Sequence, residues 1–481
     1  MEDLMSVGVV GAGVMGIGIV QVAALAGHPV KLLDAREGAA AAAIVRLGDT
    51  LATLVSKGRL AADARDAALA RIEAVSEVAQ LAGCGLAIEA IVEQVEPKRT
   101  LLRQLEAVLA PQALLASNTS SLSITLLANG LSRPERLVGM HFFNPVPLMR
   151  LVEVVSGAET DPAAAAQVEA LARAWGKQPV HAASTPGFIV NRIARPFYAE
   201  TLALLQERAA APEVLDACLR AAGFRMGPCE LMDLIGHDTN ALVTRAVWEA
   251  NFGDRRYQPS LIQQALVDGG RLGRKSGRGF FVGPAPRWPV VQRPAAALPI
   301  TLVGRGPNVE MLARRLPGVA RESTEAGWSG LRSGSLELAF TDGRCAYEAG
   351  RPLMDWLAHE QADALGVTTD DAQVADLLAC AGLRAMVLRD TPGLVVARTL
   401  AMLVNEASDA VWQGVCTEEG ADTAMRLGVN YPDGPFAWRR LFGAEALCSL
   451  LDHIWTQTRS ERYRISPPLR AASTSATPCK P

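Results

Sequence analysis

Residues 5–16 read Met-Ser-Val-Gly-Val-Val-Gly-Ala-Gly-Val-Met-Gly. The apolar first half predicts a short buried strand, and residues 14–27 predict a helix. Between them, Gly11 permits a tight turn, Gly13 lets the backbone approach a pyrophosphate, and Gly16 lets the helix pack closely on the strand. Because free amides and the dipole at a helix N-terminus favour anions, this turn predicts a dinucleotide phosphate site.

A carboxylate ends the next predicted strand. Residues 29–34 read Pro-Val-Lys-Leu-Leu-Asp, so Asp34 stands where a carboxylate can accept hydrogen bonds from both ribose hydroxyls. A glycine turn that serves packing alone is the alternative, and Asp34 makes the nucleotide site the stronger interpretation. A carboxylate would repel a 2′-phosphate, so Asp34 favours NAD over NADP, with Arg36 close enough to keep NADP an alternative.

Alternating strands and helices continue to about residue 184. Further strands are predicted near 85–89, 113–117, 136–141 and 150–155, separated by alanine- and leucine-rich helical stretches. This alternation predicts an α/β fold with a Rossmann-like, mostly parallel, doubly wound sheet. After Thr185-Pro186-Gly187 the sequence is typical of an all-α domain to about residue 283.

The second half of the chain is a degenerate repeat of the first. Thr185-Pro186-Gly187-Phe188-Ile189-Val190-Asn191-Arg192 returns as Thr391-Pro392-Gly393-Leu394-Val395-Val396-Ala397-Arg398, and the glycine turn has a faint echo at 304–309. The predicted segments are 1–184 (NAD-binding Rossmann domain), 185–283 (helical domain), 284–298 (proline-rich linker), 299–390 (degenerate Rossmann-like segment), 391–470 (second helical domain) and 471–481 (tail).

Composition excludes several classes of protein. The net charge is −3 and aromatic residues make up 5% of the chain, which argues against a nucleic-acid partner. Eight scattered cysteines without CxxC predict reduced thiols and no metal site. From Leu4 to Val30 no residue is charged if His28 is neutral, but six glycines interrupt this run. It therefore predicts a buried strand, turn and helix rather than a membrane span, and we expect a cytoplasmic protein.

Three further motifs carry a family resemblance. They are Ser117-Asn118-Thr119-Ser120-Ser121-Leu122, His141-Phe142-Phe143-Asn144-Pro145-Val146-Pro147, and the Thr-Pro-Gly motif at 185–192. With the glycine turn, residues 5–283 resemble the 3-hydroxyacyl-CoA dehydrogenase family in order and spacing. The degenerate second half resembles the two-copy bacterial branch associated with phenylacetate catabolism, which acts on 3-hydroxyadipyl-CoA, whereas related members act on 3-hydroxybutyryl-CoA.

His141 and Glu153 suit the oxidation of an alcohol, independently of the resemblance. Oxidation of a secondary alcohol requires a base for the hydroxyl proton, and a neutral histidine such as His141, at the end of an apolar strand, suits that role. A lone histidine at a strand end is more often a core residue, and the flanking motifs favour catalysis. Glu153 lies in the apolar run Leu151-Val152-Glu153-Val154-Val155 and needs a partner there. The resemblance pairs it with His141, as the residue that orients the ring and stabilises the imidazolium.

The resemblance assigns further residues to ligands. Ser120 and Asn191 would orient the 3-oxygen and thioester carbonyl of the substrate, and Ser56 and Lys57 would contact CoA, although a solvated helix face explains the last pair nearly as well. The predicted cofactor-binding residues are Gly11, Gly13, Val14, Met15, Gly16, Asp34, Glu93, Lys98, Ser120, Asn144 and Lys275.

These motifs predict NAD-dependent oxidation of an (S)-3-hydroxyacyl-CoA to the 3-ketoacyl-CoA. One alternative is a dehydrogenase for a free hydroxy acid or sugar nucleotide, which would commonly use a lysine base. Another is a non-catalytic NAD-binding protein, which would require a lost catalytic residue. In the second copy, Val309 replaces the third glycine and Ala397 replaces the substrate amide, so we expect one NAD per chain. The resemblance implies an acyl-CoA substrate, and its single-copy members pair through their helical domains as homodimers. We therefore expect a homodimer, and no membrane partner.

Overall fold

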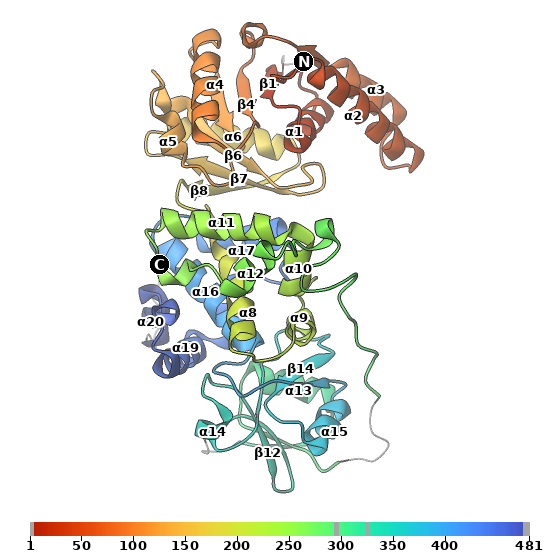
Figure 1. Ribbon diagram of the computed structural model, residues 1–481, viewed down its shortest axis with the longest axis vertical. Helices are drawn as coiled ribbons and strands as arrows, with labels where there is room; N and C mark the ends of the chain where they lie inside the picture. Colours follow the sequence, from red (N-terminus) through yellow and green to blue (C-terminus); the bar gives the residue numbers. More distant parts are fainter. Residues whose placement is uncertain (1–3, 293–297, 324–326, 475–481) are drawn as a thin grey trace. The chain divides into compact units, whose positions relative to one another are not determined.

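The computed structural model describes residues 4–292, 298–323 and 327–474 (Figure 1). The chain divides into two compact units. The first consists of Met1–Val190 with Gly414–Gly428, and the second of Asn191–Gln413 with Val429–Pro481. The first unit therefore contains one segment that the sequence assigns to the second helical domain.

The first unit is built on an eight-stranded sheet of order β3-β2-β1-β4-β5-β6-β7-β8. All neighbouring strands are parallel except the pair of β6 and β7, which confirms the Rossmann-like α/β fold. The sequence did not predict two of its strands, β3 and β8. The strands are β1 (Val7–Val10), β2 (Val30–Leu33), β3 (Ile72–Val75), β4 (Leu86–Glu89), β5 (Leu114–Ser117), β6 (Leu137–Phe142), β7 (Leu151–Ser156) and β8 (Gln178–Ala183).

The helices of the first unit cover this sheet and bury its apolar strands. They are α1 (Val14–Leu25), α2 (Ala39–Ser56), α3 (Ala62–Ala70), α4 (Val95–Val108), α5 (Ile124–Ala128), α6 (Pro162–Ala174) and α17 (Glu418–Gly428). The core contains fully buried Val7, Val9 and Ile19 from β1 and α1. Figure 1 shows α2 and α3 as a hairpin that extends away from the sheet. Within the described part of the chain, α2 is the helix that by length and composition could cross a membrane.

The uncharged run from Leu4 to Val30 divides as predicted, into β1, α1 and the start of β2. Helix α17 comes from the second half of the chain but packs on β7 and β8. A Cβ at its Gly428 would lie 2.7 Å from Leu151 and 3.0 Å from Val190, so the close packing of α17 favours glycine at this position.

The second unit contains two sets of helices that pack on each other. The first set is α8 (Arg195–Gln206), α9 (Pro212–Ala221), α10 (Pro228–Ile235), α11 (His237–Ala250) and α12 (Leu261–Asp268). The second is α16 (Val396–Trp412), α18 (Pro435–Phe442), α19 (Ala444–Thr458) and α20 (Pro467–Thr474). Helix α20 continues four residues beyond the predicted end of the helical domain at residue 470, into the predicted tail. Residues 475–481 of the tail, and 293–297 of the linker, lie outside the described residues.

Buried ion pairs join the two sets of helices. Arg192, in α7 (Val190–Ile193), donates to Glu406 of α16 at 2.7 Å, and Arg398 of α16 donates to Glu200 of α8 at 2.8 Å. Arg256 also contacts Glu406, at 3.2 Å. The second helical segment therefore covers the first within one chain.

The degenerate segment forms a second sheet, of seven strands in the order β10-β9-β11-β12-β13-β14-β15. Its strands are β9 (Thr301–Val303), β10 (Ala320–Glu322), β11 (Gly330–Ser333), β12 (Leu336–Phe340), β13 (Leu353–Met354), β14 (Ala364–Val367) and β15 (Arg384–Val387), with helices α13 (Pro307–Arg315), α14 (Ala346–Ala349) and α15 (Ala372–Cys380). The parallel β9 and β10 repeat β1 and β2, but β11 pairs with β9 in the antiparallel direction. The second sheet is therefore mixed.

Candidate active site

The glycine turn has the geometry that a dinucleotide phosphate needs. Gly11 has φ of +111°, and a side chain at this position would collide with the carbonyl of Ala90. A side chain at Gly16 would lie 1.8 Å from the oxygen of Gly11. Gly13 differs, because no described atom lies within 4 Å of the position that its Cβ would occupy. Packing therefore requires Gly11 and Gly16, whereas Gly13 leaves open space at the start of α1.

Helix α1 begins at this space without a side-chain cap and without an acidic residue in its first turn. Its first-turn amides can therefore bind a pyrophosphate. Val14 is 70% exposed and Met15 is half-buried at the same turn, as expected of residues beside a cofactor.

Asp34 is held beside the turn. Its carboxylate accepts hydrogen bonds from the amide of Ala12 at 2.8 Å and from the amide of Arg36 at 3.0 Å. Burial would raise the pKa of Asp34, but these bonds and the Arg36 guanidinium hold it below its usual value. Asp34 is therefore a fixed, ionised acceptor beside the glycine turn, and its contact with a ribose stays a prediction.

His141 and Glu153 face each other on the antiparallel strands β6 and β7. His141 Nδ1 lies 2.6 Å from Glu153 Oε2, and the residues are 6% and 0% exposed. Since a carboxylate only accepts, Nδ1 carries the proton and Nε2 of the neutral ring has the free lone pair. The rings of Phe143 and Phe188 pack beside the imidazole, with centroids at 4.5 and 5.9 Å.

The second oxygen of Glu153 binds the chain that follows the Thr-Pro-Gly motif. Oε1 accepts hydrogen bonds from the amides of Ile189 at 3.0 Å and Val190 at 2.9 Å. Glu153 therefore orients His141 and also caps the start of α7. The sequence predicted the first role but not the second.

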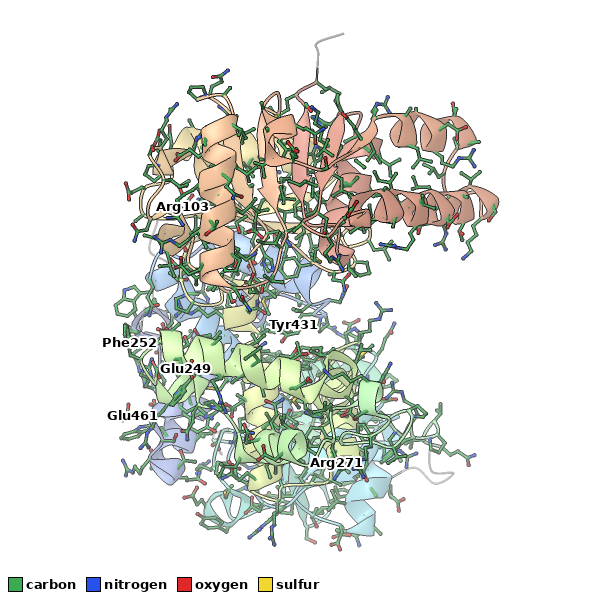
Figure 2. All side chains as sticks on the ribbon, turned by 45° about the horizontal axis from the view of Figure 1, so that its top comes forward. Arg103, Glu249, Phe252, Arg271, Tyr431 and Glu461 are labelled. Carbon is green, nitrogen blue, oxygen red and sulfur yellow. The ribbon has the colours of Figure 1, made fainter. Side chains whose placement is uncertain are left out.

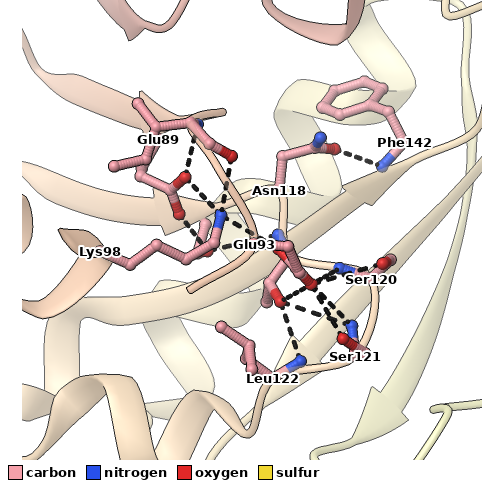
Figure 3. Close-up of polar contacts among 11 residues, drawn as sticks. Glu89, Glu93, Lys98, Asn118, Ser120, Ser121, Leu122 and Phe142 are labelled. Atoms are coloured by element: carbon pink, nitrogen blue, oxygen red, sulfur yellow. Dashed lines mark hydrogen bonds and ion pairs between the residues drawn. The ribbon is translucent and has the colours of Figure 1, made fainter. Parts of the chain in front are cut away.

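The loop that carries Ser120 is organised by Glu93 (Figure 3). Glu93 Oε1 accepts hydrogen bonds from Thr119 Oγ1 at 2.6 Å and from the amides of Ser120 at 2.9 Å and Ser121 at 3.1 Å. Burial favours the neutral acid, but Lys98 and these donors lower the pKa of Glu93 below its usual value. Glu93 therefore fixes Ser120 through the backbone, in addition to the cofactor contact that the sequence predicts.

Lys98 lies beneath this loop and is 1% exposed. Its ammonium is 2.5 Å from Glu89 Oε1 and 3.2 Å from Glu93 Oε2. The hydroxyl of Ser117 donates to the other oxygen of Glu89 at 2.6 Å. Lys98 thus positions Glu93, and its direct contact with a cofactor stays a prediction.

Sequence reasoning missed Glu89 and Asn118. Glu89 is fully buried in the apolar strand β4, and an acid in such a run was the signal that identified Glu153. Asn118 Oδ1 accepts a hydrogen bond from the amide of Phe142 at 2.9 Å and so ties the Ser120 loop to the strand end beside His141. Its position between Ser117 and Thr119 gave no separate signal.

The remaining predicted residues lie in several places. Asn144 follows β6 and precedes a cis-proline, Pro145. Ser56 ends α2 with its hydroxyl bonded to the carbonyl of Thr53, and exposed Lys57 caps that helix. Asn191 and Lys275 belong to the second unit, where Lys275 pairs with Asp238 at 2.5 Å. Their predicted ligand contacts stay predictions.

The second copy keeps a carboxylate that caps the helix start, but that carboxylate is not paired with a histidine among the described residues. Buried Asp355 accepts hydrogen bonds from the amides of Val395, Val396 and Ala397, as Glu153 does at the equivalent helix start. Among the described residues, its hydrogen-bond partners include no histidine. The sequence of this segment has no recognisable second strand, but the structure contains one, β10, which ends at Glu322. The Glu322 carboxylate pairs with Arg332 at 2.5 Å.

The described residues form neither a metal-binding cluster nor a disulfide. Among them, no group of three or more His, Cys, Asp or Glu side chains could hold a metal ion. The seven described cysteines are free thiols.

The doubly wound sheet, the open glycine turn and the His141–Glu153 pair together define an NAD-dependent dehydrogenase. The profile "3-hydroxyacyl-CoA dehydrogenase, NAD binding domain" matches residues 6–185. The profile "3-hydroxyacyl-CoA dehydrogenase, C-terminal domain" matches twice, at 187–283 and 393–475. The chain belongs to the 3-hydroxyacyl-CoA dehydrogenase family.

Some relatives match nearly the whole chain, and others match little more than its first half. The chain is 42% identical to 3-hydroxyadipyl-CoA dehydrogenase of Escherichia coli K12, over 96% of each chain. A crystal structure of 3-hydroxybutyryl-CoA dehydrogenase from Escherichia coli K12 superposes with a TM-score of 0.87 at 41% identity and covers 98% of both chains. The 3-hydroxybutyryl-CoA dehydrogenase of Bradyrhizobium diazoefficiens is 43% identical, but this match covers 57% of the chain and 94% of that relative.

Proposed function

We propose that this chain oxidises (S)-3-hydroxyacyl-CoA to 3-ketoacyl-CoA with NAD, and that its substrate is 3-hydroxyadipyl-CoA or 3-hydroxybutyryl-CoA. The observation that carries the proposal is the buried His141–Glu153 pair, 2.6 Å apart, in the same unit as the open glycine turn. Many dehydrogenases for free hydroxy acids use a lysine as the base. A histidine paired with a glutamate therefore disfavours that alternative. The intact pair also disfavours a non-catalytic NAD-binding protein.

In this proposal each residue has a separate role. His141 Nε2 removes the proton of the 3-hydroxyl, and Glu153 holds the ring and stabilises the imidazolium that results. Ser120 and Asn191 orient the 3-oxygen and the thioester carbonyl. Bound NAD supplies the acceptor for the hydride of C3. Gly13 and the first-turn amides of α1 would hold the phosphates, and Asp34 would accept hydrogen bonds from the ribose hydroxyls.

The test is NADH oxidation followed at 340 nm with acetoacetyl-CoA, and NAD reduction with (S)-3-hydroxybutyryl-CoA and (S)-3-hydroxyadipyl-CoA. We expect activity with at least one CoA ester and none with free 3-hydroxybutyrate. Activity with the free acid alone would favour the alternative dehydrogenase, and NAD binding without activity would favour the non-catalytic alternative.

Assembly and location belong to the same proposal. We propose a cytoplasmic enzyme that forms a homodimer and binds neither nucleic acid nor membranes. Light scattering on the purified chain measures its mass in solution. Because the second helical segment already packs on the first within one chain, a dimer must form through another face.

A further inference from the structure

Arg195, the first residue of α8, is a buried cation with an unsatisfied donor. The residue is 5% exposed, and its Nε has no hydrogen-bond partner among the described residues. Its Nη1 donates to the hydroxyl of Thr244 at 3.1 Å, and its guanidinium lies 4.9 Å from the ring centroid of Tyr198. Burial lowers the pKa of Arg195 because these neighbours are neutral.

The other buried arginines in the described part of the chain all reach a carboxylate. Arg192 and Arg256 both pair with Glu406, at 2.7 and 3.2 Å. Arg398 pairs with Glu200 at 2.8 Å, and Arg136 pairs with Glu106 at 3.6 Å. No described carboxylate lies within ion-pair distance of Arg195. Because an unpaired buried charge is strongly unfavourable, this departure indicates a ligand that brings the missing anion.

A cavity lies against this arginine. It has a volume of about 440 Å³, and its walls include Arg195, Tyr198, Thr244, Tyr257 and Gln263. The other charged groups of its walls are already paired, since Glu207 accepts from Arg398 at 2.8 Å and Arg462 lies 3.5 Å from Glu200. Arg195 is therefore the charged group that the cavity offers to a ligand.

A second unsatisfied group lies near Arg195. The hydroxyl of Tyr431, labelled in Figure 2, is buried and has no hydrogen-bond partner among the described residues. Burial raises the pKa of Tyr431, and Tyr198 adds to this effect while Arg195 opposes it. Arg195 Nε and the Tyr431 hydroxyl are therefore two donors without a partner that a carboxylate could satisfy.

The chain itself connects this cavity to the proposed substrate site. Asn191 lies in α7, which ends at Ile193, and Arg195 begins α8 after Ala194. Because four residues of chain span at most about 14 Å, Asn191 and Arg195 belong to one short stretch of the chain. Tyr198 and Leu202 follow Arg195 at helical spacing on α8 and line the cavity with it.

We infer that Arg195 binds the far carboxylate of a dicarboxylic 3-hydroxyacyl-CoA, and that the cavity at α8 receives the end of the acyl chain. This inference rests on the proposed function, in which Asn191 holds the thioester end. A methyl-terminated chain would leave the guanidinium without its anion, so Arg195 selects between acyl chains of equal length by their terminal group.

The experiment compares (S)-3-hydroxyadipyl-CoA with (S)-3-hydroxyhexanoyl-CoA, which differ only in the terminal group. In the wild-type chain kcat/KM should be higher for the dicarboxylic substrate. Arg195→Met should lower the ratio of the two kcat/KM values by about 100-fold, the usual effect of removing one partner of a buried charge pair. Arg195→Lys should keep part of the preference. Arg225→Met, at an exposed arginine, is the matched control and should leave the ratio within about twofold.

Thermal unfolding without substrate separates binding from structure. Because Arg195 has no counter-ion, Arg195→Met should melt at the same temperature as the wild type or higher. An unchanged substrate ratio in Arg195→Met would overturn the inference, as would an equal loss with both substrates or a variant that fails to fold. Absence of activity with every 3-hydroxyacyl-CoA in the wild type would instead refute the proposed function.

Discussion

His141 Nδ1 lies 2.6 Å from Glu153 Oε2, across the one antiparallel pair of strands in the first sheet. In this pairing the two residues are directly opposite each other, so the backbone register itself holds the imidazole against the carboxylate. The other Glu153 oxygen accepts from Ile189 and Val190, which prevents the carboxylate from turning away. The fold itself therefore holds the imidazole of His141 in one orientation.

His141→Gln should cut turnover by roughly 100-fold or more, because a general base contributes about this factor. Glu153→Gln should lower turnover less if orientation is its main role. Calorimetry should show NAD affinity unchanged in both variants, with one NAD per chain. The control is His181→Gln, an exposed histidine on β8. Turnover of His141→Gln within a few-fold of the wild type would remove this residue from the mechanism.

Asp34→Ala should raise KM for NAD about tenfold, with a smaller effect on turnover at saturation, because it removes the predicted acceptor of the ribose hydroxyls. The same change releases Arg36, whose guanidinium lies 3.1 Å from that carboxylate. We therefore also expect the preference for NAD over NADP to fall. Steady-state kinetics with both cofactors measure the effect, and Arg36→Ala shows how much the arginine contributes. Unchanged KM for NAD in Asp34→Ala would contradict the ribose role.

Lys98→Met should destabilise the protein by about 3 kcal/mol, because it leaves the buried carboxylate of Glu89 without its cation. It should also lower turnover, since Glu93 would no longer hold the Ser120 loop. Denaturant unfolding and steady-state assays measure the two effects. Arg103→Met, on the exposed face of the same helix (Figure 2), should change stability by less than about 0.5 kcal/mol. Equal effects of the two substitutions would show that the buried network is unimportant.

Lys177 makes stability depend on pH in the alkaline range. Its ammonium donates to the carbonyls of Val146 and Met149, and burial lowers its pKa from 10.5 to about 8. Between about pH 8 and pH 10.5 Lys177 is protonated in the unfolded chain and neutral in the folded chain. The free energy of unfolding therefore rises with pH over this range. Lys177→Met should remove this rise in denaturant unfolding, whereas exposed Lys57→Met should retain it. Parallel pH curves for wild type and Lys177→Met would contradict the assignment.

Deletion of residues 286–481 should expose the faces that the second copy covers. Arg192 and Arg256 would lose Glu406, α8 would lose α16, and β7 with β8 would lose α17. The truncated protein should aggregate or self-associate while it keeps His141 and Glu153, and light scattering with activity assays measures this. A truncated protein that stays soluble, monomeric and fully active would show that the second copy has no covering role.

Most of the fold and part of the site could be predicted from the sequence because their signals are local. The spacing of Gly11, Gly13 and Gly16 between an apolar strand and a helix reflects backbone constraints that act within a few residues. The same holds for Asp34 at a strand end and for Glu153 in an apolar run. These patterns predicted the Rossmann-like sheet, the cofactor and the catalytic pair.

Only the tertiary structure decided the contacts between distant segments. The placement of α17 on β7 and β8, the bonds of Glu93 to the Ser120 loop, and the second role of Glu153 depend on chain paths that no local period encodes. The sequence alone does not distinguish Arg192, Arg195 and Arg225 as partners for a terminal carboxylate. The structure separates them, because Arg192 is paired with Glu406, Arg225 is exposed, and Arg195 is buried without a carboxylate. The physical reason is that burial and charge compensation are properties of the packed molecule, whereas strand, turn and helix are properties of neighbouring residues.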